Sequence, residues 1–278
     1  MMLIGSFNLK KILYLTDLYY QAKGRNYCEE DLYITSILKD NFDVVLCHPR
    51  NSESFEENVD LIVFRNTGSV LGYKEVYDNF IQRVKKNNLN TFNDFKGKAD
   101  MCGKQYLLDL TLEDYPVIPT VDSIDNLDLL PIVDSYVIKP KDGADSLGLK
   151  IVYKDELYTE NLSEDMLIQP TIDFKYELSF YFLNNEYQYA LYAPNPNKRW
   201  ELKEYKPTKE EISFAQKFID WNTIEKGIQR VDACKTQDNK LLLMELEDLN
   251  PYLSLFELKD DKRHNFVSKL IDTFDNLA

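Results

Sequence analysis

Three acidic residues and one arginine towards the end of the chain have the spacing of a cation-binding hairpin. Arg230 and Asp232 belong to one predicted strand, and Glu245 and Glu247 belong to the next, across a polar turn at 237–239. Residues two apart on a strand point from the same face, so the four side chains should converge. Burying three carboxylates is costly unless cations lie between them. The alternative is a surface hairpin with solvated acids, in a chain that is acidic throughout.

A magnesium ion suits such a site, because Mg²⁺ prefers oxygen ligands. A Mg²⁺ ion held by few carboxylates usually also contacts the phosphates of a nucleotide. The two histidines, His48 and His264, are too few for a histidine-based metal site.

The composition limits the classes of function. The chain has 278 residues, a length that fits two or three small domains. Its net charge of −14 argues against non-specific binding to nucleic acid or to an anionic membrane. Four cysteines lie far apart without a CxxC pair, as expected of reduced thiols in a cytoplasmic protein. No signal-peptide pattern is visible, and no apolar run approaches the roughly 20 residues of a membrane span.

The first third of the chain predicts a parallel α/β layer. Short apolar strands alternate there with helices, which is the pattern of such layers. Strands are expected at residues 11–16, 42–47 and 60–65, and helices at 29–38 and 74–86. No Gly-x-Gly-x-x-Gly follows the first strand, so the dinucleotide-binding fingerprint is absent from the sequence.

The rest of the chain is richer in strands. A helix carrying Lys104 is expected at residues 103–110. Hairpin turns and a capping box mark several later elements. We expect strands at 136–140, 149–153 and 166–170, a hairpin at 177–193 that turns at Asn184-Asn185, a helix at 208–221 with Thr208 and Glu211 as its capping box, the hairpin at 230–246, and a helix at 261–277.

The order of these pieces resembles the ATP-grasp superfamily, which includes D-alanine–D-alanine ligase and prokaryotic glutathione synthetase. The pieces are Lys104, Lys139 before a Gly/Ser turn, Gln169-Pro170, Glu177 and the acidic hairpin, over roughly residues 90–255. Several short motifs resemble those of the branch that contains the cycloserine-forming O-ureido-serine ligase. These motifs are Arg65-Asn-Thr67, Lys104-Gln-Tyr-Leu107, Glu177-Leu-Ser179, Arg230-Val-Asp232 and Met244-Glu-Leu-Glu247.

The resemblance implies an α/β fold class, with α+β character in the C-terminal part. An ATP-grasp fold would follow an N-terminal Rossmann-like parallel α/β domain. The expected domains are residues 1–93, residues 94–171 with the central lysine and the glycine loop, and residues 172–278 with the metal-binding hairpin.

The resemblance also implies an ATP site. Lys104 and Lys139 would contact the α- and β-phosphates. A solvated lysine is the ordinary alternative, but less so for Lys139, which follows β-branched residues in the strand Val-Ile-Lys-Pro. The turn after Lys139 carries Gly143, Ser146 and Gly148, and its backbone N–H groups would suit closure over phosphates.

The segment from Gln169 to Glu177 would hold the rest of the nucleotide. The adenine hinge would be Gln169, Pro170, Thr171 and Ile172, where the backbone meets the base. Asp173 could accept hydrogen bonds from the ribose hydroxyls, or it could simply end a strand without a binding role. Glu177 could contact the ribose or a lysine near the phosphates.

The metal ligands implied by the resemblance are Asp232, Glu245 and Glu247, for Mg²⁺ or alternatively Mn²⁺. Most of the superfamily has Glu-x-Asn where this chain has Glu-x-Glu, and a second carboxylate binds Mg²⁺ at least as well on charge grounds. Arg230 and Lys139 are expected in catalytic roles, Arg230 by neutralising charge that develops during phosphoryl transfer.

Three residues are candidates for substrate contacts. Arg65 lies at the end of a strand of the first domain, and ligands of doubly wound sheets bind outside such strand ends. It could form a bidentate hydrogen bond with a substrate carboxylate, or it could be a surface arginine. Arg199, near Trp200, could reach the same cleft or lie on the surface. Asn250 could position substrate or start a turn before Pro251.

The expected function is that of an ATP-dependent carboxylate–amine ligase, which acts through an acyl phosphate on a small amino-acid or peptide substrate. Its partners would be a small carboxylate and an amine, without nucleic acid or membrane, and a homodimer is left open. One alternative is an ATP-grasp protein that binds nucleotide without turnover. Another is a kinase or a cyclase on the same fold.

Overall fold

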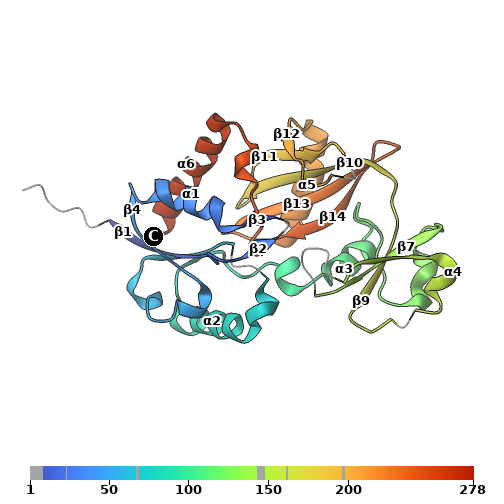
Figure 1. The fold of residues 1–278 in the computed structure, drawn as a ribbon, viewed down its shortest axis with the longest axis horizontal. Helices are drawn as coiled ribbons and strands as arrows, with labels where there is room; N and C mark the ends of the chain where they lie inside the picture. Colours follow the sequence, from blue (N-terminus) through green and yellow to red (C-terminus); the bar gives the residue numbers. More distant parts are fainter. Residues whose placement is uncertain (1–8, 23, 67–68, 143–147, 161, 196–197) are drawn as a thin grey trace, which may run out of the picture. The chain divides into compact units, whose positions relative to one another are not determined.

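The computed structural model describes residues 9–22, 24–66, 69–142, 148–160, 162–195 and 198–278 (Figure 1). The chain forms two compact units, which we call unit 1 (residues 1–95 and 249–278) and unit 2 (residues 96–248). None of the described helices combines the length and the apolar composition that a bilayer crossing requires.

Unit 1 is built on a four-stranded parallel sheet in the order β4-β1-β5-β6. The strands are β1 (Lys10–Leu15), β4 (Phe42–Cys47), β5 (Leu61–Phe64) and β6 (Thr91–Phe92). All of β5 and the last four residues of β1 are buried. Strands covered on both faces need continuous apolar runs, which is what the sequence shows there.

Helices cover both faces of this sheet. Helices α1 (Cys28–Leu38) and α6 (Asp260–Leu277) lie on one side, and α2 (Lys74–Asn87) lies on the other (Figure 1). A short hairpin of β2 (Gln21–Ala22) and β3 (Arg25–Asn26) precedes α1. Phe274 of α6 packs edge-on against Phe92 of β6, with ring centroids 5.1 Å apart. The predicted parallel α/β layer is therefore confirmed.

Unit 2 contains two antiparallel sheets. Helix α3 (Tyr106–Leu112) precedes the smaller one, which has the order β8-β7-β9 and is followed in sequence by the larger. Its strands are β7 (Ser135–Pro140), β8 (Lys150–Tyr153) and β9 (Met166–Pro170), and α4 (Lys154–Leu157) follows β8. Tyr136, Ile138 and Ile168 belong to its buried core.

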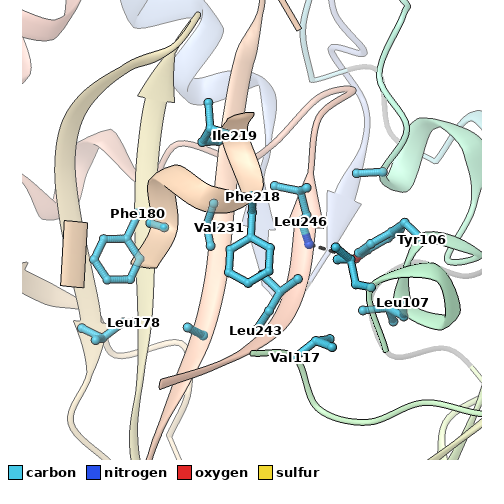
Figure 2. Packing of buried hydrophobic residues seen from close by; sticks show 14 of the residues in the cluster. Tyr106, Leu107, Val117, Leu178, Phe180, Phe218, Ile219, Val231, Leu243 and Leu246 are labelled. Atoms are coloured by element: carbon cyan, nitrogen blue, oxygen red, sulfur yellow. Dashed lines mark hydrogen bonds between the residues drawn. The ribbon is translucent and has the colours of Figure 1, made fainter. Parts of the chain in front are cut away.

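The larger sheet has five strands in the order β12-β11-β10-β13-β14. They are β10 (Phe174–Leu183), β11 (Glu186–Ala193), β12 (Lys203–Tyr205), β13 (Ile228–Thr236) and β14 (Leu241–Glu247). Figure 2 shows Phe218 and Ile219 of α5 (Lys209–Asn222) in one buried cluster with Val231, Leu243 and Leu246 of the sheet. Because side chains alternate along strands, the opposite face remains for polar residues.

One predicted element is wrong in a way that matters for the site. The helix expected from residue 103 begins at Tyr106, so Lys104 precedes the helix. Gly103 has φ +78°, a left-handed conformation that interrupts a helix. The N–H of Lys104 donates to the carbonyl of Lys141 at 2.9 Å. By contrast, the capping box of Thr208 and Glu211 is confirmed.

Candidate functional site

Three carboxylates meet on the face of the larger sheet that points away from α5. In the antiparallel register of β13 and β14, Asp232 lies opposite Glu245, and Arg230 lies opposite Glu247. Asp232, Glu245 and Glu247 each offer an oxygen, and these three oxygens lie within 4.8 Å of one another. The hairpin therefore brings together the residues that the sequence nominated as metal ligands.

Arg230 lies between two of these carboxylates. Its Nε and Nη2 donate to the carboxylate of Asp232 over 2.9–3.1 Å, and Nη2 also donates to Glu247. Ser179 of β10 donates a further hydrogen bond to Asp232 at 2.6 Å. Burial would lower the pKa of Arg230, but Asp232 and Glu247 raise it well above its ordinary value. The guanidinium therefore stays charged.

Two lysines approach the third carboxylate. Lys104 Nζ lies 3.7 Å from Glu245 Oε1. Lys139 is 9% exposed, and burial lowers its pKa to about 8 although Glu245 acts to raise it. Burial would raise the pKa of Glu245, but the nearby cations, first Lys104 and then Lys139, hold it below its usual value. Because Lys139 belongs to β7, the site draws on both sheets of unit 2.

Glu247 has a different environment from Glu245. Burial raises the pKa of Glu247 to about 8, and the negative charge of Asp232 adds to this effect, while Arg230 opposes it. A carboxyl that resists ionisation beside two other acids is suited to receive a cation. Of the three carboxylates, Glu247 therefore gains most from a bound metal ion.

Arg199, in the connection between β11 and β12, forms an ion pair with Glu177 of β10. Burial raises the pKa of Glu177, and Arg199 lowers it. Arg199 also interacts electrostatically with Asp232 and Glu245. The structure thus brings Arg199, predicted as a substrate contact, to the residues predicted to bind nucleotide and metal.

The predicted adenine hinge begins at the end of β9. Gln169 is buried, and its Nε2 donates to Thr120 Oγ1 at 2.8 Å. The backbone N–H of Thr171 donates to the carbonyl of Ser135 at 3.1 Å. These bonds fix the hinge to its own sheet.

The remaining hinge residues lead to β10. Pro170 is buried opposite Tyr136, and Ile172 is half-buried. Asp173 is exposed and accepts a hydrogen bond from Gln237 Nε2 at 3.1 Å. Asp173 therefore already has a partner from the turn between β13 and β14.

The predicted phosphate loop is only partly described. Gly143 and Ser146 lie outside the described residues. Gly148 has φ +77°, and a Cβ atom there would lie 2.9 Å from Pro140 Cγ. This position therefore needs glycine, both for its backbone conformation and for space.

The other two predicted substrate residues belong to unit 1. Arg65 is 2% exposed, so the alternative of a surface arginine is wrong. Its Nε lies 3.5 Å from the buried carboxylate of Asp31, and its Nη1 donates to the carbonyl of Pro251 at 3.0 Å. Asn250 precedes Pro251 in the segment that follows β14. Arg65 and Asn250 thus share one local region of unit 1.

Sequence analysis missed three polar residues around the carboxylates. Ser179 lies two positions after Glu177, so strand periodicity could have placed it on the same face. Asp248 extends the acidic run of β14, yet it is fully buried. Tyr106 accepts a hydrogen bond at 2.9 Å from the N–H of Leu246, which separates the two glutamates (Figure 2). No sequence signal pairs residues so far apart.

No family model matches this chain, and no curated protein matches its sequence. Solved structures do match. A D-cycloserine synthetase, DcsG, matches with a TM-score of 0.72 and 17% identity, over 95% of this chain and 99% of that chain. The D-alanine–D-alanine ligase of Bacillus anthracis, complexed with ATP, matches with a TM-score of 0.68 and 15% identity, over 96% of each chain.

A third structure comes from Chryseobacterium gregarium. It is a RiPP-associated ATP-grasp ligase in complex with ADP and a leader and core peptide, and it matches with a TM-score of 0.67 and 11% identity, over 97% of this chain and 98% of that chain. These likenesses extend over almost the whole chain, beyond residues 90–255 that carry the resemblance of the sequence. The chain therefore has an ATP-grasp fold.

Proposed function

We propose that this protein is an ATP-dependent ligase that joins a carboxylate to an amine through an acyl phosphate. The observation that carries the proposal is the convergence of three carboxylates and Arg230 of the larger sheet with Lys139 of the smaller sheet and with Lys104, which precedes α3. The fold supports ATP as the energy source, because the solved structures that share it include ligases complexed with ATP or ADP.

The donor set fits a magnesium ion. Asp232, Glu245 and Glu247 offer three oxygen ligands within 4.8 Å of one another, which is the chemistry that Mg²⁺ prefers, and Mn²⁺ is an alternative. A divalent ion bound there would neutralise oxygens of the nucleotide phosphates.

The charges of the site are nearly balanced before any ligand binds. Four cationic side chains face four acidic side chains. The cationic side chains are Lys104, Lys139, Arg199 and Arg230, and the acidic ones are Glu177, Asp232, Glu245 and Glu247. A balanced site suits a nucleotide whose phosphates are already neutralised by divalent ions. We therefore expect ATP binding to depend on Mg²⁺.

The proposed reaction has two steps. A carboxylate oxygen of the first substrate attacks the γ-phosphorus of ATP, the bond to the bridging oxygen breaks, and ADP leaves with the electron pair. An amine then attacks the acyl carbon, inorganic phosphate leaves, and the nitrogen loses a proton. Arg230 would offset charge on the transferred group, and Lys104 and Lys139 would hold the phosphates.

The first experiment measures ATP binding by calorimetry with and without Mg²⁺. It compares the wild type with the double variant Glu245→Gln/Glu247→Gln. We expect Mg²⁺-dependent binding in the wild type and its loss in the variant. The matched control is Glu164→Gln/Glu186→Gln, which removes two exposed acids of unit 2 and should bind as the wild type does.

Absence of binding at millimolar ATP in the wild type would overturn the proposal. ATP binding that changes neither with Mg²⁺ nor with the double mutation would mean that the metal site lies elsewhere. With binding established, ADP release in the presence of amino acids or peptides identifies the substrates. The product mass then separates a ligase, which joins two substrates, from a cyclase, which removes water from one, and from a kinase, whose product keeps the phosphate.

A further inference from the structure

Residues 97–104 form a segment, here called the strut, that connects β14 with the end of β7. Towards its start, the N–H groups of Ala99 and Met101 donate to the carboxylate of Asp248 at 3.0 and 2.9 Å. At its end, the N–H of Lys104 donates to the carbonyl of Lys141 at 2.9 Å. The strut therefore bridges the residues that directly follow β14, which carries Glu245 and Glu247, and β7, which carries Lys139.

Asp248 is built into the fold as an anchor for the strut. It directly follows Glu247 and is fully buried. Besides the two N–H groups, it accepts a hydrogen bond at 3.1 Å from Asn222, and its own N–H donates to Asp100 at 2.6 Å. Asn222 in turn accepts the N–H of Lys98 at 2.6 Å. Backbone donors of this kind bind a buried carboxylate strongly.

Gly97 shows how closely the strut approaches this carboxylate. A Cβ atom at Gly97 would lie 2.0 Å from Asp248 Oδ2 and 2.8 Å from the side chain of Met101. No residue larger than glycine fits unless the strut or Asp248 moves. Glycine at position 97 therefore allows the strut to pack directly against Asp248.

We infer that Asp248 is a positioning residue, which sets Lys104 relative to the metal-binding carboxylates through the strut. A lysine side chain is flexible, so the place of its ammonium group depends on where its backbone is held. Lys104 Nζ lies 3.7 Å from Glu245 Oε1, and the strut is the route by which Asp248, three residues beyond Glu245, controls that distance. The inference rests on the proposed function, in which Lys104 contacts a phosphate of ATP.

The test is a double-mutant cycle of Gly97→Ala with Lys104→Ala, read as the dissociation constant of Mg²⁺-bound ATP by calorimetry. Each single variant should weaken binding about tenfold, the scale of one lost charge-assisted hydrogen bond. The double variant should bind no more weakly than the weaker single variant, because both changes remove the same contact. If Gly97→Ala weakened binding through an effect unrelated to Lys104, the two losses of affinity would multiply, and the double variant would bind about a hundredfold more weakly than the wild type.

Each result decides between two readings. Gly72→Ala is the matched control, because a Cβ atom there meets nothing within 4 Å, and it should bind as the wild type does. Wild-type affinity in Gly97→Ala beside weakened binding in Lys104→Ala would overturn the strut inference and leave the proposed function standing. Unchanged binding in Lys104→Ala would also overturn it.

A wild type that does not bind ATP would overturn both proposals together. Circular dichroism and thermal unfolding check that each variant is folded. If Gly97→Ala does not fold, Asp248→Asn replaces it in the cycle. The amide keeps the size of the side chain, but Ala99 and Met101 donate to different oxygens of Asp248, and the amide has only one oxygen.

Discussion

Arg230 donates hydrogen bonds from both Nε and Nη2 to the carboxylate of Asp232, two residues further along β13. The same guanidinium contacts Glu247, so one cation stabilises two of the three proposed metal ligands. A metal ion and Arg230 would therefore neutralise overlapping charge. Removing one of them should make the protein more dependent on the other.

Replacing Arg230 with glutamine should expose this dependence. Without Mg²⁺, we expect the free energy of unfolding to fall by about 3 kcal/mol, because the partly buried carboxylates lose their cation. Thermal unfolding with and without Mg²⁺ is the measurement, and Mg²⁺ should raise the melting temperature more in Arg230→Gln than in the wild type. Lys203→Gln, an exposed cation of the same sheet, is the control. Equal Mg²⁺ shifts in Arg230→Gln and the wild type would contradict the idea of shared stabilisation.

The affinity for ATP should fall as the pH rises through 8. Burial lowers the pKa of Lys139 to about 8, so this ammonium is charged below that pH and neutral above it in the free protein. Phosphates favour the charged form, so binding above pH 8 must include the uptake of a proton. Up to about tenfold in affinity should be lost for each pH unit above 8, until the pKa in the complex is reached.

The control for this prediction is Lys139→Arg. A guanidinium keeps its charge throughout this range, so the variant should lose the part of the pH dependence that comes from Lys139, while Glu247, whose pKa burial raises to about 8, still titrates. Calorimetry in two buffers of different ionisation enthalpy measures the proton uptake directly. Equal proton uptake near pH 8.5 in the wild type and in Lys139→Arg would show that Lys139 does not face the phosphates.

Removing the hydroxyl of Tyr106 should destabilise unit 2. Tyr106 is 1% exposed, and its oxygen accepts the N–H of Leu246 between the two glutamates of β14 (Figure 2). Tyr106→Phe leaves that buried N–H without its acceptor, at a cost of about 1–3 kcal/mol. Chemical denaturation measures the loss, with Tyr115→Phe in the same core as the control. A change below about 0.5 kcal/mol would mean that the N–H finds another acceptor.

Glu30 should make the stability of unit 1 depend on pH. It is fully buried and accepts the N–H groups of Leu253 and Leu255 at 2.9 and 2.7 Å. Burial raises its pKa from 4.5 to about 7, although Arg65 opposes this. The folded protein therefore holds this proton more tightly than the unfolded chain does, so stability is lost as the pH rises from about 4.5 to 7.

The measurement compares unfolding free energies of the wild type and Glu30→Gln across this range. Between pH 4.5 and 7, the unfolding free energy of the wild type should fall by ~3 kcal/mol relative to that of Glu30→Gln, since glutamine does not titrate. Glu29→Gln, at an exposed position of the same helix, should leave the pH profile unchanged. A difference that stays constant with pH would rule out Glu30 as the titrating group.

Local signals predicted most of the elements, because their causes lie within a few residues. Asn184 has φ +56° in the turn between β10 and β11, and asparagine tolerates that conformation, which is why the turn could be predicted. The capping box of α5 needs only Thr208 and Glu211. The convergence of Asp232 with Glu245 and Glu247 follows from strand periodicity and one hairpin register.

Contacts between distant parts of the chain could not be predicted in this way. Arg65 could have been a surface residue until its partner Asp31, on another element, was located. Asp248 holds the strut from about 150 positions away, through backbone N–H groups that every sequence has. Gly103 delays the start of the expected helix to Tyr106 because its φ is positive, and glycine in a sequence only permits that conformation.

The division of the chain into units has a consequence for synthesis and folding. Unit 1 is interrupted, since residues 96–248 are inserted between its two parts, whereas unit 2 is continuous. On the ribosome, unit 2 can therefore complete its chain while the parallel sheet of unit 1 still lacks α6 and the segment that Glu30 and Arg65 hold. The part of the protein made first would be the last to reach its native structure.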